Sequence, residues 1–482
     1  MKENAKKATF LFPDPLKPLL KGLLEAEIPL YAVGGMVRDQ LLKRESKDLD
    51  LLVMAPNAAP KLLERAQAIG LKSFPLDQER GIFRGIYKGW IVDFTEPRAP
   101  TLDDDLFERD FTINALAVHI TRNSIEHGGQ VFDPTGGLGD LHRRRLRTAR
   151  RRNIQDDPLR ALRCYRFALV LGFQIEEETQ ELVEEGLCNL NRIAGERIAE
   201  ELSTIFSHPL SHTLWTSMAR RGTLPLVFPL LEQCQGDLTG KWYGCDLLFH
   251  QVGVLKGTET VLASLPLLVP AHWRDLRVLL TTRVEGGWTQ GSLLKLAALL
   301  HDIGKPMCRR REGDKVVFWG HDRSGEALLD ELIEQLKLGR AASSALKTHV
   351  REHMRMHLLA RPGEISPKAK GRYLRDLGDS APLTPLLSLA DAWASSGDVG
   401  LFNLLPFVEE MVSFYYNNYL QQGEPIKPLL NGHRVMEILG IEPGPKVGQV
   451  LEMLIDAQLE GAITTPEEAE EWLRGLREEA NV

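Results

Sequence analysis

Strand-like segments are concentrated near the start of this 482-residue sequence. Within residues 28–141, short apolar runs such as 82–87 and 90–94 alternate with helical segments, which predicts a small mixed sheet covered by helices. Beyond Pro158 the pattern is helical almost to the end, and only residues 316–319 have an extended pattern. This change predicts an α+β chain in which a small mixed-sheet head precedes an all-α neck, body and tail.

Length and charge set broad limits on the protein. A chain of 482 residues exceeds what one hydrophobic core usually supports, so we expect about two to four domains. The net charge of −7 argues against a uniformly basic nucleic-acid surface. Residues 143–152, RRRLRTARRR, nevertheless form a local basic strip, which is either a solvated face or a contact for a nucleic-acid backbone.

Cysteine usage and hydropathy indicate the compartment. The cysteines show no CxxC pair, which argues against structural zinc and against a disulfide framework. The first residues lack the apolar core of a secretory signal, and no run approaches the length of a membrane span. We therefore expect a cytoplasmic protein without a membrane partner. The cysteines are Cys164, Cys188, Cys234, Cys245 and Cys308.

A glycine pair ends the apolar run 28–33 and begins a predicted helix. Gly34 and Gly35 would let a polyphosphate approach the backbone amides, and the positive end of the following helix favours an anion. Arg38 lies on the early face of that helix. A glycine pair alone more often marks a turn, so a phosphate-binding role depends on the residues beyond it in the chain.

Two carboxylates come next at a spacing that suits metal binding. Asp48 and Asp50 alternate with apolar residues in a strand-like run, so both side chains point to one face and could bind one or two magnesium ions. A third acid, Asp93, lies in the apolar run 90–94, where an isolated carboxylate is costly unless it is paired or metal-bound. The DxD spacing alone is commonly a solvated strand end.

Joined at this spacing, GGMVRD and KDLD resemble the first motif of the nucleotidyltransferase superfamily that includes DNA polymerase β, in its class II tRNA nucleotidyltransferase and bacterial poly(A) polymerase branch. The resemblance implies that Asp48, Asp50 and Asp93 are catalytic and bind Mg²⁺. One ion would lower the pKa of an attacking 3′-hydroxyl, and the other would bind the triphosphate and stabilise the leaving pyrophosphate. The glycine pair and Arg38 would bind the phosphates.

Residues 108–115, ERDFTINA, resemble the RRDFTINA motif of the same family, with Glu108 in place of the first arginine. The resemblance places Arg109, Asp110 and Asn114 near the sugar and phosphates of the incoming nucleotide, where an amide and a carboxylate could recognise a 2′-hydroxyl. Asp110 alone could instead be a helix cap. Capping does not account for the whole octet.

Two further motifs resemble structural parts of the family. Residues 133–141, DPTGGLGDL, followed by Leu146 and Arg147, resemble DPxGGxxDLxxxxLR, and we interpret them as a hinge between head and neck. Residues 196–202, ERIAEEL, resemble ERIxxEL, and we interpret them as support for the neck. With the helix that begins near Asp156 included, the resemblance covers about residues 28–205.

Residues 156–168, DDPLRALRCYRFA, begin a helix that could choose a base. Asp157 and Arg160 are three residues apart, so a carboxylate that accepts from an exocyclic amino group lies beside a guanidinium that donates to a ring acceptor. This pair favours cytosine and adenine, although the spacing alone also fits an intrahelical salt bridge. The segment resembles the family's EDxxR motif, with Asp156 in place of Glu. Further nucleotide-binding candidates are Arg163 and Arg166.

A second set of candidate ligands lies in the helical half. The run LLHDIGK places adjacent imidazole and carboxylate groups at the end of an apolar helix, and the set resembles the H…HD…D pattern of HD-domain metal phosphohydrolases. Mixed nitrogen and oxygen ligands suit a divalent transition metal or magnesium. The same fold could instead serve tRNA docking without hydrolysis. The candidate ligands are His250, His301, Asp302, His321, His353 and Asp391.

Two more histidines share helical spacing with His353. His349 and His357 could supplement the metal site or form a polar helix face, and we favour the polar face for His349. The expected domains are a nucleotidyltransferase head (1–140), a neck with the base-selecting helix (141–205), a helical body (206–245), an HD domain (246–395) and a helical tRNA-binding tail (396–482).

The resemblance implies a tRNA nucleotidyltransferase that adds C, A or both to the 3′ end of tRNA from CTP and ATP, with the acceptor arm held by backbone-directed positive charge. A poly(A) polymerase shares every head motif. A protein of another class, an HD phosphohydrolase or phosphodiesterase with a degenerate head, is the second alternative. The segment between Asp93 and Arg109 is short for a CCA-adding enzyme, which favours CC addition with a separate A-adding partner.

Overall fold

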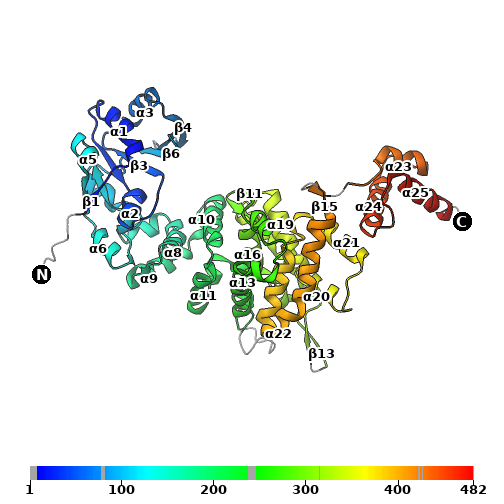
Figure 1. Ribbon diagram of the computed structural model, residues 1–482. Coiled ribbons are helices and arrows are strands. Elements are labelled where there is room, and N and C mark those ends of the chain that lie inside the picture. The colour runs from blue at the N-terminus through cyan, green and yellow to red at the C-terminus, as the bar shows by residue number, and fades with distance from the viewer. Residues whose placement is uncertain are drawn as a thin grey trace. The chain divides into compact units, whose positions relative to one another are not determined.

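The computed structural model describes residues 8–77, 82–236, 246–313, 315–421, 424–425 and 427–480, and Cys245 lies outside them. The chain divides into two compact units, Met1–Ala194 and Gly195–Val482. Unit 1 holds the main sheet, and unit 2 is mostly helical (Figure 1). No helix of the described residues is long and apolar enough to cross a bilayer.

Unit 1 is built on an eight-stranded mixed sheet with the strand order β1-β8-β7-β2-β3-β6-β5-β4, which confirms the predicted fold class. Within it β3 and β6 pair in parallel, and the other neighbours are antiparallel. The strands are β1 (Thr9–Phe10), β2 (Leu30–Val33), β3 (Asp48–Val53), β4 (Lys72–Asp77), β5 (Ile82–Tyr87), β6 (Trp90–Thr95), β7 (Ala117–His119) and β8 (Gly129–Phe132).

A two-residue turn fixes the register of β5 against β6. Lys88 and Gly89 have φ angles of 47° and 80°, as a tight hairpin turn requires, and Tyr87 pairs with Trp90 beside them. The same register places Arg84 directly opposite Asp93. The turn therefore decides which side chain faces a predicted site residue.

Helices cover the sheet and continue from it within unit 1. Leu19, Leu20 and Leu23 of the first helix are buried, which matches its amphipathic sequence. The helices are α1 (Lys17–Leu24), α2 (Gly35–Leu41), α3 (Ala59–Ala68), α4 (Leu102–Phe107), α5 (Arg122–His127), α6 (Gly137–His142), α7 (Arg152–Asp156), α8 (Leu159–Leu171) and α9 (Glu177–Leu187), with short turns η1 (Asp14–Leu16), η2 (Thr112–Asn114) and η3 (Leu190–Arg192).

Unit 2 is organised around a buried helix, α16, whose residues 291–300 are all buried. It packs against α10, α13, α15, α19 and α22. The helices are α10 (Gly195–Ser207), α11 (Ser211–Arg221), α12 (Leu224–Val227), α13 (Leu247–Ala263), α14 (Leu265–Leu268), α15 (Trp273–Thr281), α16 (Gln290–Leu300), α17 (Lys305–Cys308), α18 (His321–Gln335), α19 (Arg340–Glu352), α20 (Arg355–Ala360), α21 (Pro367–Leu377), α22 (Thr384–Phe414), α23 (Gly432–Leu439), α24 (Pro445–Leu459) and α25 (Pro466–Ala480), with turns η4 (Pro229–Cys234), η5 (Gly378–Ser380) and η6 (Tyr415–Tyr419).

Short strand pairs interrupt the helical pattern more often than the sequence indicated. The predicted extended run 316–319 contributes to β14, but the other strands are two or three residues long and too short to show a period of two. These pairs are β9 (Arg145–Leu146) with β10 (Gln174–Ile175), β11 (Arg283–Glu285) with β12 (Trp288–Thr289), β13 (Arg310–Glu312) with β14 (Lys315–Val317), and β15 (Leu420–Gln421) with β16 (Glu424–Pro425).

The five domain boundaries within the two units stay predictions. Gly397, close to the boundary predicted at residue 395, has a φ of 63° and breaks the helical conformation within α22. The last three helices share a small core of their own that includes Val435, Leu454 and Leu473. The predicted body, 206–245, ends in residues 237–245, which lie outside the described part of the chain.

Asp140 connects the glycine-rich segment 133–141 to the strand that follows it. Its fully buried carboxylate accepts from Thr112 Oγ1 at 2.7 Å, from Arg145 Nη2 at 2.8 Å and from Arg147 Nε at 2.9 Å. A buried carboxylate with this many donors has a structural role. The interpretation of the segment as a hinge stays a prediction.

We expect Asp140→Ala to lower the free energy of unfolding of unit 1 by about 3 kcal/mol, because Thr112 and two arginines lose their acceptor. Hydrogen exchange of the sheet amides measures this change locally. Glu181→Ala, at an exposed position on α9, is the matched control and should change stability by less than about 0.5 kcal/mol. Equal exchange in the two variants would contradict the prediction.

Candidate functional site

The turn between β2 and α2 lies against two predicted site residues. Gly34 has a φ of 75°, and a Cβ built on it would lie 3.0 Å from Asp50 Oδ2 and 3.5 Å from Arg109 Nη1. A larger residue at position 34 would therefore be strained by its backbone and crowded by Asp50. Gly34 thus permits the close approach of this turn to the acid and to the arginine.

Strands β3 and β6 bring two predicted acids together. Their parallel register places Asp50 opposite Asp93, and Asp48 precedes Asp50 on the same strand. Burial raises the pKa of Asp50, Arg109 opposes this effect, and the charges of Asp93 and Asp48 add to it. A divalent cation would relieve the repulsion between these acids, so the residues fit such an ion.

Asp93 already has a partner, which the sequence analysis missed. Arg84 donates from Nε to Asp93 Oδ1 at 2.8 Å and from Nη2 to Asp93 Oδ2 at 2.7 Å. Among the described residues, groups of three ligand atoms within 4.8 Å of one another are found only in unit 2. The role of Asp93 as a third metal ligand therefore stays a prediction, and it requires the metal to compete with Arg84.

A chain of hydrogen bonds joins three of the predicted motifs. Arg38 Nη1 donates to Asn114 Oδ1 at 2.6 Å, and Asn114 Nδ2 donates to Asp110 Oδ1 at 3.0 Å. Arg163 Nη2 pairs with Asp110 Oδ2 at 2.8 Å. Burial opposes the ionisation of Asp110, but Arg163 and the Asn114 amide hold its pKa at about 2. The three motifs thus meet at one ionised carboxylate.

Asp105 positions Arg109, and the sequence analysis did not single it out. Its fully buried Oδ2 accepts from Arg109 Nε at 3.3 Å and from Nη2 at 3.2 Å. Its Oδ1 accepts from the backbone N–H of Arg98 at 2.8 Å. The i,i+4 spacing was the available signal, but three consecutive aspartates at a helix start are equally typical of a solvated first turn.

The predicted base-selecting residues flank the start of α8. The backbone N–H of Arg160 donates to the Asp157 carbonyl at 2.9 Å, so both residues belong to one turn. Burial raises the pKa of Asp110, and the charge of Arg160 lowers it, although less than Arg163 and Asn114 do. The structure therefore places Arg160 within electrostatic reach of the ionised carboxylate.

Phe167 on α8 is a further residue that the sequence analysis missed. Its ring centre lies 4.3 Å from the guanidinium carbon of Arg166, 5.0 Å from that of Arg38 and 5.8 Å from that of Arg163. These distances are typical of cation–π contacts, which keep arginine side chains in place while leaving their donors available. An aromatic residue in an apolar helix pattern carries no sequence signal that separates this role from core packing.

The basic strip 143–152 is largely neutralised within unit 1. Five of its seven arginines pair with carboxylates, which leaves less positive charge for a nucleic acid than the sequence suggested. Glu108, the departure from the family motif, is one of these partners. The pairs are Arg145 and Arg147 with Asp140, Arg150 and Arg152 with Glu108, and Arg151 with Glu178.

The predicted metal ligands of unit 2 gather around Asp302, which is fully buried just after α16. On one side, Asp302 Oδ2 lies 3.2 Å from His301 Nε2 and 3.5 Å from His250 Nε2. Asp391 Oδ1 completes this group at 3.2 Å from His250 Nε2 and 3.8 Å from His301 Nε2. Four predicted ligands thus surround one small volume.

A second group forms at the other oxygen of the same carboxylate. Asp302 Oδ1 lies 3.3 Å from His321 Nε2 and 3.5 Å from His353 Nε2, and these two nitrogens are 3.3 Å apart. Asp302 is therefore shared between two groups of candidate ligands. Each of the two groups could hold a metal ion.

Hydrogen bonds through Nδ1 leave the Nε2 lone pairs of three histidines available to bind a metal ion. In His301, His321 and His353, Nδ1 lies 2.9, 2.8 and 2.6 Å from the carbonyl oxygen of the residue three positions earlier. A carbonyl oxygen only accepts, so Nδ1 carries the proton and the Nε2 lone pair faces the group. Burial opposes the ionisation of Asp302, but His301 and Lys305 hold its pKa well below the usual range.

The two additional histidines differ in their surroundings. His349, for which we favoured a polar face, is instead fully buried, with Nδ1 2.9 Å from Thr384 Oγ1, and burial lowers its pKa to about 4. The correction arises because its helix, α19, packs on α22 at this position. His357 is partly exposed, and its Nε2 lies 3.5 Å from Asp391 Oδ2, which suits a supplementary ligand.

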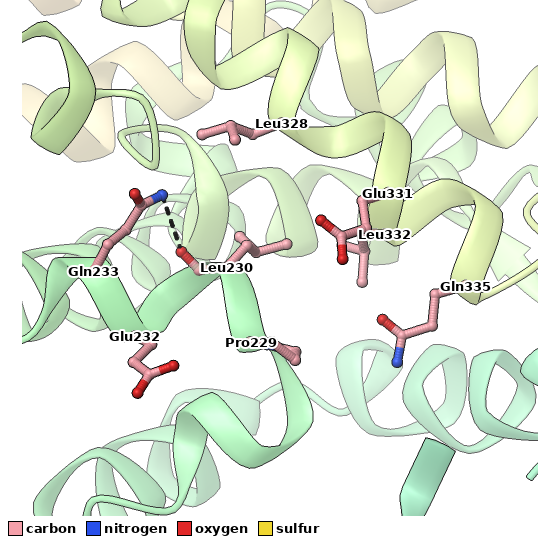
Figure 2. A pocket seen from close by; sticks show the side chains of 8 residues that line it. All are labelled: Pro229, Leu230, Glu232, Gln233, Leu328, Glu331, Leu332 and Gln335. Carbon is pink, nitrogen blue, oxygen red and sulfur yellow. Dashed lines mark hydrogen bonds between the residues drawn. The ribbon is translucent and has the colours of Figure 1, made fainter. Parts of the chain in front are cut away.

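Unit 2 also contains a cavity of about 450 Å³ between η4 and α18. Gln233 Nε2 donates to the Leu230 carbonyl oxygen at 3.4 Å. Figure 2 shows this contact and the carboxylates of Glu232 and Glu331 among the lining side chains. None of the predicted site residues lines it, and its polar groups form no ligand cluster among the described residues. The lining residues are Pro229, Leu230, Glu232, Gln233, Leu328, Glu331, Leu332 and Gln335.

Three family models match successive parts of the chain. The model described as the poly A polymerase head domain matches residues 30–89 and 86–147. The model described as a probable RNA and SrmB-binding site of polymerase A matches residues 172–234. The HD domain model matches residues 278–394, which include all candidate ligands of unit 2 except His250. Members of the head and HD families normally use divalent metal ions.

Similar proteins align with nearly the whole chain. The A-adding tRNA nucleotidyltransferase of Deinococcus radiodurans is 33% identical over 93% of this chain and 95% of its own. The CC-adding tRNA nucleotidyltransferase of Thermus thermophilus is 32% identical over 93% and 94%. The solved CCA-adding enzyme of Thermotoga maritima with tRNA matches in fold, with a TM-score of 0.60, 22% identity and coverage of 96% and 94%.

We expect Asp302→Asn to reduce metal binding at both groups of unit 2, because the variant removes the charge that they share. Metal bound per chain, measured by elemental analysis after dialysis against Mn²⁺ in the Asp50→Ala background, should fall by more than half. His433→Gln, at an exposed position on α23, is the control and should retain its metal. Full retention of metal by Asp302→Asn would contradict the assignment.

Proposed function

The chain belongs to the tRNA nucleotidyltransferase family, and we propose that it adds cytidine nucleotides from CTP to the 3′ end of tRNA. The observation that most strongly supports a nucleotide site in the head is the chain of hydrogen bonds from Arg38 through Asn114 and Asp110 to Arg163. It joins the glycine-pair helix, the ERDFTINA octet and α8, which the family resemblance assigns to one nucleotide. Relatives that align along most of the chain do not favour a poly(A) polymerase or a degenerate head.

The phosphates of the nucleotide would bind beside Gly34 and Gly35. Because Gly34 has no side chain, a triphosphate can approach the turn next to Asp50. Arg38 and Arg109 would donate to its oxygens. Arg38 is held by the Asp39 carboxylate and the Asn114 amide, and Arg109 by the Asp105 carboxylate, and each guanidinium keeps further N–H groups available. Asp110 and Asn114 would recognise the sugar.

Asp48, Asp50 and Asp93 would hold Mg²⁺, whose oxygen preference their carboxylates match. When bound, the ions would supply activation of the 3′-hydroxyl and stabilisation of the leaving pyrophosphate. The chain's own contribution is to keep Asp50 at the parallel register with Asp93 and to hold Arg109 beside it through Asp105. These contacts order the acids before substrate arrives.

Base choice would come from the first turn of α8. Asp157 would accept from the exocyclic amino group and Arg160 would donate to a ring acceptor, which suits cytosine and adenine. Arg163 and Arg166 would stay ordered through Asp110 and Phe167. Such a pair would select a base without a nucleic-acid template.

The connection between β6 and α4 favours addition of C alone. It spans only residues 96–101, and it is secured by Thr101, which accepts from the backbone N–H of Asp104, and by Arg98, whose backbone N–H donates to Asp105. A short, secured segment has little freedom to reshape the pocket for ATP, and the resemblance links an abbreviated loop here to CC addition. A separate A-adding enzyme would then complete the end.

The acceptor arm of tRNA would be bound through its backbone and shape. Because much of the strip 143–152 is paired internally, Arg143 and Arg144 are its arginines that form no ion pair with a described residue. The four described cysteines are free thiols, which suits the reducing cytoplasm where we place the enzyme.

The product distinguishes the alternatives. With transcripts ending at the discriminator base, at C and at CC, we expect the first two to be extended to CC and the CC-ending transcript to ignore ATP. Gel analysis with CTP alone, ATP alone and both measures this. A product ending in CCA would show that the short connection does not restrict the enzyme to C.

Asp50→Ala should reduce extension at least about 100-fold, because a metal-binding carboxylate is lost from the reaction. Asp103→Ala is the matched control, since this exposed aspartate of α4 belongs to no candidate site. Extension that survives Asp50→Ala would contradict the assignment of the head.

We propose a second activity, metal-dependent hydrolysis of phosphate esters, at the HD residues of unit 2. Ionised Asp302 and Asp391 and the prepared Nε2 atoms of three histidines support it, because hydrolytic sites with two metal ions use such ligands. Lys305 beside Asp302 could contact a substrate phosphate. A transition metal suits this mixture of nitrogen and oxygen ligands.

Hydrolysis of p-nitrophenyl phosphate with Mn²⁺, Co²⁺, Ni²⁺ or Mg²⁺ tests this activity. We expect release of nitrophenolate that Asp302→Asn lowers at least about tenfold and that Asp50→Ala leaves unchanged. If no metal supports hydrolysis by the unmodified chain, unit 2 has a docking role only.

A further inference from the structure

Arg84 is a cation placed directly beside the acids of the head. It lies on β5 opposite Asp93 on β6, and Asp93 lies opposite Asp50 on β3. The three residues therefore form one row across neighbouring strands, with their side chains on the same face of the sheet. A charged row of this kind brings one guanidinium to the edge of the predicted metal site.

The pair between Arg84 and Asp93 occupies both oxygens of the carboxylate. The two contacts are 2.8 and 2.7 Å, and the geometry is the parallel, bidentate form that arginine makes with acids. The hydrogen bond with Asp93, and more weakly the charges of Asp48 and Asp50, raise the pKa of Arg84. Arg84 therefore neutralises part of a cluster of negative charge.

A divalent ion and Arg84 would compete for Asp93. Each oxygen has a further lone pair, but a guanidinium and a doubly charged ion at the same carboxylate repel each other strongly at contact distance. The side chain of Arg84 is 37% exposed, so it can leave Asp93 and remain hydrated. The side chain of Asp93 is 15% exposed and has no such freedom.

We propose that Arg84 is an exchangeable counter-ion of Asp93, which it holds in the metal-free protein and releases when a divalent ion binds beside Asp50. This inference rests on the proposed function, since it requires a metal site at Asp48, Asp50 and Asp93. Arg84 is a positioning residue: it keeps Asp93 oriented toward the site and it lowers the affinity for metal. The alternative is a permanent structural pair in which Asp93 never contacts the ion.

Binding of Mn²⁺ to the full chain tests the exchange. The Asp302→Asn background reduces binding by unit 2, and free Mn²⁺ is measured by electron paramagnetic resonance. We expect Arg84→Lys and Arg84→Gln each to lower the Kd by about two- to fivefold, because a partly exposed pair is weak and its loss removes a competitor. Arg122→Gln, at an exposed position on α5, is the matched control and should leave the Kd unchanged.

Arg84→Lys separates exchange from charge, because it keeps the positive charge and loses the bidentate contact. Tighter binding in Arg84→Gln alone would show a charge effect at a distance and overturn the proposal. In an Asp93→Asn background the gain from Arg84→Lys should disappear, and a gain that persists there would also overturn it. An unchanged Kd in both Arg84 variants would identify a permanent pair.

The same experiment separates this inference from the proposed function. Asp50→Ala should remove the head's share of the Mn²⁺ binding that remains in the Asp302→Asn background. If Asp50→Ala leaves binding unchanged, the metal site of the head is itself wrong. If Asp50→Ala removes the head's share of the binding while the Arg84 variants behave like Arg122→Gln, the metal site stands and the exchange is wrong.

Discussion

An ionised carboxylate can be buried in a protein only beside a cation, a metal ion or several hydrogen-bond donors, and this constraint organises both candidate sites. In unit 1, Asp110 is held by Arg163 and Asn114, and Asp140 by two arginines and a threonine. In unit 2, imidazoles surround Asp302. Because each acid has at least one partner distant in the sequence, the same contacts that stabilise the fold also bring the motifs together.

Local pattern predicted much of the head. The alternation around Asp48 and Asp50 indicated a strand with both acids on one face, and the apolar run around Asp93 indicated its neighbour. The pairing of Arg84 with Asp93 was not predictable, because it depends on the register that the Lys88 and Gly89 turn imposes on two strands. Side-chain partners across strands depend on register, which a sequence pattern does not specify.

In the helical half, too, the residue types were predictable from the sequence and the side-chain partners were not. The residue types around Asp302 indicated a metal site, but the separation into two groups depends on how α18 and α19 lie against the end of α16, which periodicity does not encode. Burial of His349 against Thr384 depends on the same packing. The positive charge of the basic strip was predictable from the sequence. Its ion pairs with Glu108, Asp140 and Glu178 were not, because they depend on the fold.

Glu108 affects which substitutions this chain tolerates near the basic strip. It replaces an arginine of the family motif and lies against Arg150 and Arg152. An arginine at position 108 would place three guanidiniums together, with only Asp104 beside Arg150 to offset their charge, so the arginine of the family motif does not suit this background. Positions 108, 150 and 152 therefore form an epistatic set, and substitutions among them are tolerated in combination rather than singly.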